Sequence, residues 1–186
     1  MKKTVKRTAP EIKSNIQFSA AGDIVELIKR DHKPLKALIK ILKDSDLERS
    51  DKEEPLEEFV MLLTTHAKSE EKSLYVAMKE YDDLKIESYE GDTEHSIAET
   101  LIQEINASPL DEEWLAKVKV LAEVVEHHII EEETKLLKAV QKSIDLEIRK
   151  VIGEDYENFM TEYNLVSTPQ SLRKNRIPKS VNSFVN

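Results

Sequence analysis

Two segments of this sequence place a histidine and a glutamate four residues apart. The first pair is His66 and Glu70, the second is His128 and Glu132, and a further glutamate follows directly after each pair. In an α-helix, residues with this spacing lie one turn apart on the same face, with Cβ atoms roughly 5–6 Å from each other. Imidazole and carboxylate are both metal ligands, so each segment predicts one face of a metal site.

Apolar residues surround both pairs at helical spacing. Around the first pair lie Phe59, Leu62, Leu63, Leu74 and Ala77, and around the second lie Leu121, Val125, Leu136 and Ala139. The pattern predicts that both pairs point into a hydrophobic core. Burying an unpaired carboxylate there would cost several kcal/mol, and a bound cation would remove that cost.

His32 and His95 provide two more imidazoles on separate predicted helices. Taken alone, each would more often be a partly buried, hydrogen-bonded histidine than a ligand. Together with the two His/Glu pairs, they make four helical segments that each carry one histidine. Four such segments converging on one centre predict a dinuclear metal site inside a helical bundle.

The composition favours long helices over sheets. The 186 residues include three glycines and six prolines, and a chain of this length fits one domain with its own core. There is no cysteine, which excludes disulfides, thiolate zinc sites, iron–sulfur clusters and cysteine nucleophiles. We therefore expect an all-α domain whose metal ligands are nitrogen and oxygen atoms.

Capping residues and apolar periodicity predict where the helices lie. The expected helices cover about 23–44, about 51–81, a shorter segment that begins at Asp92 or Thr93 and carries His95, and about 109–142. Beyond them, an amphipathic segment from Leu146 to Met160 predicts a fifth helix packed outside the others. The repeated motif indicates a pseudo-symmetric four-helix bundle.

Charge is distributed unevenly along the chain. The net charge is −9, but residues 1–20 and 165–186 each carry +4, which leaves −17 on residues 21–164. Phosphate contacts need a basic surface, so we expect no nucleic-acid binding by this acidic domain. The predicted organisation is a basic N-terminal arm over 1–20, the helical domain over 21–164 and a basic, flexible tail over 165–186.

We find no targeting signal in the sequence. The basic N-terminus reaches Pro10 and Glu11 without the apolar segment of a signal peptide, and no later segment is apolar enough to span a membrane. We therefore expect a soluble, cytoplasmic protein that does not associate with a membrane.

The order of these elements resembles the hemerythrin-like family of HHE cation-binding domains. The resemblance covers roughly residues 23–142 and is carried by His32 in the segment Arg-Asp-His-Lys-Pro-Leu, by the two His-x-x-x-Glu-Glu segments and by the Glu94-His95 pair. It implies an up-down-up-down four-helix bundle around a non-heme di-iron centre. In this chain, the extra C-terminal helix would be added to that bundle.

The resemblance also implies a role for each ligand. The terminal nitrogen ligands would be His32, His66, His95 and His128, and the bridging carboxylates would be Glu70 and Glu132. An oxo or hydroxo group would bridge the two iron ions. Zinc and manganese fit the same ligands, so the sequence does not choose the metal.

At one position the sequence departs from the oxygen-carrying members of the family. Those members have a second histidine four residues after the histidine of the third helix, where this chain has Glu99. If Glu99 is a ligand, its charge stabilises ferric iron and favours redox turnover over reversible oxygen carriage. Alternatively, Glu99 lies on a solvated face, or His127, about 100° from His128 around the helix, replaces the missing histidine. Glu71 and Glu133 are expected beside the ligands or at the surface.

The expected function is that of a di-iron protein for small oxidants. It would bind dioxygen or nitric oxide, or react with hydrogen peroxide in a catalase-like cycle. Whether the chain is an enzyme stays open, because an iron or oxygen sensor, or an iron store, would use the same ligands without turnover. A bundle that binds only protein partners is a third alternative. Without cations, however, its paired buried carboxylates would repel each other and destabilise the core. The sequence also leaves open a homo-oligomer and the identity of a redox partner.

Overall fold

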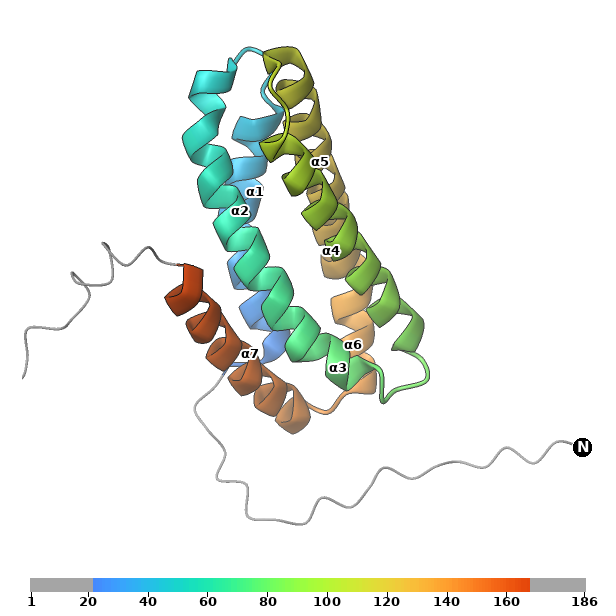
Figure 1. Ribbon diagram of the computed structural model, residues 1–186. Helices are drawn as coiled ribbons and strands as arrows, with labels where there is room; N and C mark the ends of the chain where they lie inside the picture. Colours follow the sequence, from blue (N-terminus) through green and yellow to red (C-terminus); the bar gives the residue numbers. More distant parts are fainter. Residues whose placement is uncertain (1–21, 168–186) are drawn as a thin grey trace, which may run out of the picture.

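The computed structural model describes residues 22–167, and this part of the chain contains helices and short connections but no strand (Figure 1). The long helices of the bundle are α1 (Ile24–Lys43), α2 (Arg49–Lys72), α4 (Lys85–Asn106) and α5 (Asp111–Glu131). Shorter elements follow two of them: α3 (Leu74–Met78) after α2, and the π-helical turn η1 (Glu132–Leu136) with α6 (Leu137–Ser143) after α5. The last helix, α7 (Leu146–Ser167), packs outside the bundle. The predicted all-α fold with an extra C-terminal helix is confirmed.

Two apolar cores fill the bundle, one towards each end. The first core consists of Leu35, Leu38, Ile39, Leu42, Leu56, Phe59, Leu63, Ala98, Ile105, Trp114, Val118, Leu121, Ala122, Val125 and Ile129. The second core consists of Ile24, Val25, Leu27, Ile28, Leu74, Tyr75, Met78, Leu84, Leu136, Leu137, Val140, Ile144, Ile152 and Tyr156. The chain enters the second core first, and each successive long helix runs between the cores in the opposite sense. This alternation is the expected up-down-up-down arrangement.

A layer of buried polar side chains separates the two cores on every long helix. On α1, for example, His32 lies between Ile28 of the second core and Leu35 of the first. The layer is therefore enclosed by apolar side chains along the bundle axis. Electrostatic interactions inside it are stronger than they would be in water.

The long helices are amphipathic. In α1, Glu26, Arg30 and Lys33 are exposed, whereas Ile28 and Leu35 on the opposite face are buried. This pattern suits a helix that packs on one side and meets water on the other. Within residues 22–167, no helix has both the length and the apolar character needed to cross a membrane.

The structure confirms the predicted cap of α1 at Asp23, whereas α2 begins at Arg49 and is capped by Glu48, ahead of the expected cap at Ser50 and Asp51. Asp23 caps α1, because its Oδ1 accepts a hydrogen bond of 3.1 Å from the Val25 backbone N–H. At the start of α2, the side chains of Glu48 and Asp51 form a capping box. The cap of α1 depends on residues adjacent in the chain, which is why the sequence reveals it.

The start of α4 is a correction to the sequence analysis. This helix begins at Lys85 rather than after Asp92 or Thr93, so Gly91 lies inside it. A Cβ atom added to Gly91 would be 2.5 Å from the Tyr75 hydroxyl oxygen and 2.6 Å from its Cζ. Gly91 is therefore needed for close packing against Tyr75, and it does not end a helix.

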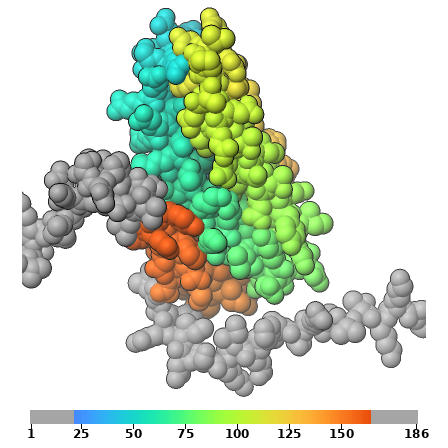
Figure 2. Space-filling view, in the orientation of Figure 1, coloured from blue at the N-terminus to red at the C-terminus, as the bar shows by residue number. Residues whose placement is uncertain are grey.

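The extra helix α7 packs against α2 and α1 at the end of the bundle that holds the second core (Figures 1 and 2). The buried guanidinium of Arg149 donates hydrogen bonds of 2.9–3.1 Å to both carboxylate oxygens of Asp23. It also donates to the Ile144 carbonyl oxygen at 2.8 Å. These contacts tie the start of α7 to the cap of α1.

The predicted terminal segments are covered only in part. The N-terminal arm over 1–20 lies outside the described residues, as does the predicted tail beyond residue 167. The first residues of that tail, 165–167, belong to α7.

Candidate metal centre

Four histidines and two glutamates form the polar layer between the two cores. They are His32 of α1, His66 and Glu70 of α2, His95 of α4, His128 of α5 and Glu132 at the start of η1. All are buried, and the most exposed of them, His95, has a relative accessibility of 6%. The structure thus brings together every predicted ligand except Glu99.

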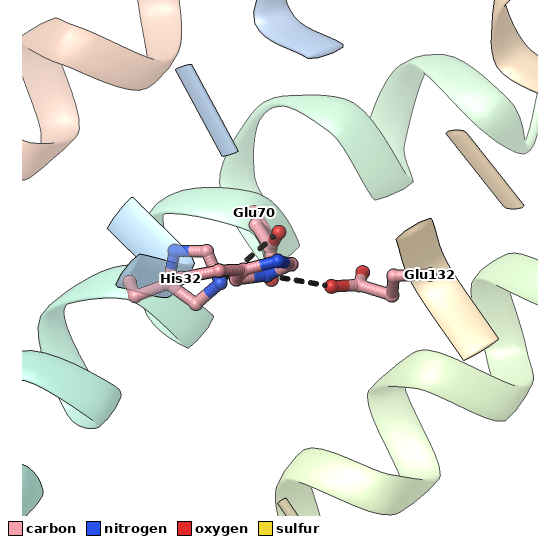
Figure 3. A group of neighbouring side chains, drawn as sticks. His32, Glu70 and Glu132 are labelled. Atoms are coloured by element: carbon pink, nitrogen blue, oxygen red, sulfur yellow. Dashed lines mark ion pairs between the residues drawn. The ribbon is translucent and has the colours of Figure 1, made fainter. Parts of the chain in front are cut away.

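Four of these side chains form a first donor group: His32, His66, Glu70 and Glu132. Each offers one ligand atom, and these atoms all lie within 4.8 Å of one another. His32 Nε2 is 3.1 Å from Glu132 Oε2, and His66 Nε2 is 3.4 Å from Glu70 Oε1. Figure 3 shows Glu70 and Glu132 reaching towards His32 from different elements. Two imidazoles and two carboxylates this close together suit one transition-metal ion.

Glu70, His95 and His128 form a second donor group. His95 Nε2 is 3.5 Å from Glu70 Oε2 and 3.2 Å from His128 Nε2. Glu70 belongs to both groups, since its other oxygen faces His66. Glu132 Oε2 is also 3.6 Å from His128 Nε2. The layer therefore offers donors for two cations, with Glu70 as a shared ligand.

Several ligand atoms in the layer are buried without a hydrogen-bond partner among the described residues. They are His32 Nε2, His66 Nε2, both carboxylate oxygens of Glu70 and Glu132 Oε2. An unsatisfied buried polar atom costs about 1–3 kcal/mol, and a charged one costs more. Coordination to a cation would supply the missing partner in each case. The donor set therefore fits metal ions.

In two of the histidines, the nitrogen that faces away from the layer contacts a carboxylate on another helix. His32 Nδ1 is 3.0 Å from Glu133 Oε1, and His128 Nδ1 is 2.6 Å from Glu94 Oε2. An ionised carboxylate can only accept a hydrogen bond, so each Nδ1 carries the proton. Each Nε2 then keeps its lone pair for a metal, the usual arrangement of a ligating histidine.

The remaining two histidines have different partners. His95 Nδ1 lies 3.3 Å from Glu71 Oε1. His66 Nδ1 lies 2.7 Å from the hydroxyl oxygen of Tyr156, which comes from α7. Glu71 thus lies next to a ligand, as the sequence predicts, and so does Glu133. The tyrosine is the one neutral partner among the four.

Tyr75 is a further buried neighbour of the layer. Its hydroxyl donates a hydrogen bond of 3.0 Å to Glu132 Oε1, and its ring stacks on His95 with centroids 5.5 Å apart. Because Oε1 is occupied in this way, Oε2 of Glu132 is the oxygen that faces His32 and His128. Tyr75 therefore orients the carboxylate towards the donor groups.

Burial and mutual interaction move the pKa values of the layer in opposite directions. Burial, reinforced by the charge of Glu132, raises the pKa of Glu70 well above its ordinary value. Burial also acts to raise the pKa of Glu132, but the nearby imidazoles, His128 foremost, outweigh it and lower that pKa. Burial, together with the neighbouring His32, lowers the pKa of His66. For His128, burial is outweighed by the surrounding carboxylates, and the pKa is raised.

The helices change their winding next to both glutamate ligands. The π-helical turn η1 begins at Glu132, and such turns often occur at functional sites. Helix α2 ends two residues after Glu70, and Ser73 separates it from α3. There the Ser73 hydroxyl donates a hydrogen bond of 2.6 Å to the Ser69 carbonyl oxygen.

The structure does not bring Glu99 to the other ligands, which corrects that expectation. Its side chain is 59% exposed, and its carboxylate lies 3.7 Å from Lys68 Nζ. Four residues turn a helix by about 400°, so Glu99 lies about 40° around α4 from His95, towards solvent. His127 is also outside the layer: its side chain is 69% exposed and its Nε2 lies 3.4 Å from Glu131 Oε2.

Sequence reasoning missed three neighbours of the ligands: Glu94, Tyr75 and Tyr156. Glu94 adjoins His95 in the motif, but the histidine that it contacts is His128, 34 residues later. Tyr156 follows the apolar pattern of α7 and is indistinguishable from an ordinary core residue in the sequence. No local signal identifies such contacts, because they join different helices.

Two clefts reach the layer from different sides. The first, of ≈ 190 Å³, lies between α2 and α4 and reaches His95 past Ala67 and Ala98. The second, of ≈ 230 Å³, lies between α4 and the α5–η1 segment and reaches His128 and Glu132. Both are small, so they suit ions and small molecules better than large substrates.

Known families and proteins show similarity to this chain. The family described as the hemerythrin HHE cation binding domain matches residues 23–140. A DNA nickase from Nostoc sp. (strain PCC 7120 / SAG 25.82 / UTEX 2576) is 28% identical over 151 residues, which is 76% of this chain and 38% of the relative. This chain therefore spans well under half the length of that relative. No solved structure matches.

Proposed function

Because this chain belongs to the hemerythrin HHE cation-binding domain family, we propose that its buried histidines and glutamates hold two iron ions for reaction with a small oxidant. The oxidant would be dioxygen, nitric oxide or hydrogen peroxide. The observation that carries this proposal is the overlap of the two donor groups at Glu70. One carboxylate with an oxygen directed at each group is the arrangement that holds two cations close together.

Iron suits this mixture of imidazole and carboxylate donors, and bound iron supplies a change between the ferrous and ferric states. The histidines of the chain place their Nε2 atoms at the two cation positions before any ion binds. His32 and His66 present Nε2 atoms on one side of Glu70, and His95 and His128 present theirs on the other. The charges of Glu70 and Glu132 would offset the charge of the cations in a layer that lies between the two apolar cores.

The size of the clefts supports a small oxidant. His95 is among the residues that line the cleft between α2 and α4, and the ≈ 190 Å³ of this cleft accommodate a diatomic molecule or a peroxide. Lys68, Glu71 and Glu99 lie at this cleft and give it charged groups. A large organic substrate would require these helices to separate.

The first test is the metal content of protein produced with ample iron and without a histidine tag, together with its optical spectrum before and after exposure to air. We expect two iron ions per chain and new absorption bands on oxidation. Consumption of peroxide, compared with that by free iron, then tests turnover. Glu70→Gln is the variant that lacks the shared carboxylate, and it should lose both the second iron ion and the reaction. Zinc alone, or no metal, in the wild-type protein would contradict the proposal.

A sensor or store of iron is the second candidate, and the same burial supports it. Cation binding in a layer that links all four long helices would change the stability of the whole bundle. This candidate predicts a large rise in melting temperature with iron but no turnover. It would replace the first proposal if two ions bind and peroxide is consumed no faster than by free iron.

Nicking of DNA is not part of the proposal, although one relative is named for it. The matched region is 38% of that relative, and a net charge of −17 on residues 21–164 opposes binding to phosphates. An assay for nicking of supercoiled plasmid with iron-loaded protein should therefore show no cleavage above background.

A further inference from the structure

We propose that Tyr156 of α7 is a positioning residue for the ligand His66 and that it makes the two cation positions chemically unequal. This inference rests on the proposed binding of cations in the buried layer. It concerns a residue outside 23–140, the part of the chain that matches the family. Helix α7 would then be a functional part of the centre as well as a cover for the bundle.

The Tyr156 hydroxyl contacts two polar groups inside the protein. The tyrosine is fully buried, and its hydroxyl oxygen lies 2.7 Å from His66 Nδ1 and 3.0 Å from Asp31 Oδ2. The two rings meet edge to face, with centroids 6.2 Å apart. These contacts join α7 to α2 at Nδ1 of His66, one of the two histidines of the first donor group, and to α1 at Asp31.

The charge arrangement around Asp31 determines which group donates. Arg30 binds both oxygens of Asp31 at 2.8 and 3.2 Å and also contacts Glu157 of α7 at 3.2 Å. A carboxylate paired with a guanidinium accepts hydrogen bonds only, so the Tyr156 hydroxyl donates to Asp31. The hydroxyl oxygen is then left to accept the proton of His66 Nδ1–H. His66 is thereby held in the tautomer whose Nε2 has a free lone pair.

This arrangement distinguishes His66 from the other ligands. The Nδ1 atoms of His32, His95 and His128 face the carboxylates Glu133, Glu71 and Glu94. A carboxylate partner increases the donor strength of a metal-bound imidazole more than a neutral phenol does. Because His66 belongs to the first donor group only, the phenol affects one cation position directly. Loss of the phenol should therefore weaken one position and spare the other.

The experiment is an equilibrium titration with cobalt(II), whose visible absorption reports its ligands. Three full-length proteins are compared: wild type, Tyr156→Phe and the matched control Tyr163→Phe, two turns further along the same helix. For Tyr156→Phe we expect the dissociation constant of one cobalt ion to rise roughly 10–100-fold, as is typical when the partner of a ligating histidine is removed. The second constant should stay at the wild-type value, and Tyr163→Phe should match wild type throughout.

A merely structural hydroxyl would give a different result. It would lower the melting temperature of Tyr156→Phe without separating the two cobalt constants, and that outcome would overturn the inference. A second measurement does not depend on the variant: ¹⁵N NMR of the imidazoles in metal-free wild type reports the His66 tautomer. We expect the proton on Nδ1, and a proton on Nε2 would also overturn the inference. If wild type bound no cobalt, the proposed function would fail and the inference with it, whereas the NMR result would still decide whether His66 carries its proton on Nδ1, beside Tyr156.

Discussion

At the scale of single residues, each imidazole of the centre has a polar partner at Nδ1, and its Nε2 faces the donor groups. In His32 and His128, Nδ1 is fixed by a carboxylate, and Nε2 points to the donor groups. Such contacts orient a ligand before any cation arrives, which reduces the entropy lost on binding. The carboxylate of Glu70 is the exception, because neither oxygen has a hydrogen-bond partner. Glu70 is therefore the residue at which metal binding and stability of the metal-free protein conflict.

Glu70→Gln tests this conflict. The folded-state pKa of Glu70 is raised, so its contribution to stability is most favourable below the unfolded pKa and is lost as the pH rises through the folded pKa. The neutral amide avoids that loss. We expect the metal-free variant to be more stable than wild type by about 1–3 kcal/mol at alkaline pH, with a smaller difference at acidic pH.

Urea unfolding in the presence of a chelator measures this difference, and metal analysis measures the loss of the second ion. Glu99→Gln is the control, since its exposed carboxylate should affect neither quantity. Loss of metal in Glu99→Gln would restore the prediction that this residue is a ligand. Equal stability of Glu70→Gln and wild type at all pH values would show that Glu70 is not strained in the metal-free state.

Cation binding should release protons. The pKa values of Glu70 and His128 are raised in the metal-free protein, and both groups must be deprotonated to coordinate a metal. Affinity should therefore fall as the pH is lowered. Calorimetric titration in buffers that differ in ionisation enthalpy measures the number of protons released, and a binding enthalpy independent of the buffer would contradict this prediction.

At the scale of elements, α3 and α4 meet where Gly91 leaves space for Tyr75. The tyrosine in turn donates to Glu132 Oε1, so the packing of two helices determines the orientation of a ligand. The same relationship recurs at His66, to which α7 supplies Tyr156. Elements without a ligand of their own thus control ligand geometry.

Gly91→Ala tests this packing through the sign of its effect. In a helix interior, glycine to alanine normally stabilises by about 0.5–1 kcal/mol. Here the added Cβ would meet the Tyr75 ring at 2.5–2.8 Å, so we expect destabilisation of about 1–3 kcal/mol. Urea unfolding of the metal-free protein measures this change in the free energy of unfolding. The control is Ser96→Ala, at an exposed position on the same helix. A more stable Gly91→Ala protein would show that Tyr75 moves aside without cost.

At the scale of the whole molecule, the polar layer interrupts what would otherwise be one continuous core. Every long helix contributes at least one ligand to it. A cation that binds this layer in the folded state, and not in the unfolded chain, stabilises all four helices together. Metal occupancy and cooperative folding should therefore be coupled.

Removal of metal should lower the melting temperature of the intact protein. Free metal at a hundred times its dissociation constant would contribute about 2.7 kcal/mol per site. Calorimetry with and without a chelator measures this fall in melting temperature. The fall should be smaller for Glu70→Gln than for wild type. A melting temperature that is independent of metal in wild-type protein would separate binding from folding and contradict this expectation.

Patterns within single helices were sufficient to predict the bundle and most of its ligands. The i, i+4 spacing of His66 with Glu70, and of His128 with Glu132, puts each pair on one face, and the flanking apolar residues bury that face. The cap of α1 at Asp23 is equally local. Where the sequence analysis failed, as at the start of α4, a tertiary contact to Gly91 overrode a local signal for a turn.

By itself, the sequence determined the all-α fold, the buried positions of the His/Glu pairs and membership of a cation-binding family, because these depend on residue order and helical periodicity. Only the tertiary structure decided that Glu99 faces solvent, that Glu70 is shared by two donor groups and that Tyr156 reaches His66. The rotation of one helix relative to its neighbours sets these contacts. That rotation results from packing over the entire bundle, and no single segment of the sequence encodes it.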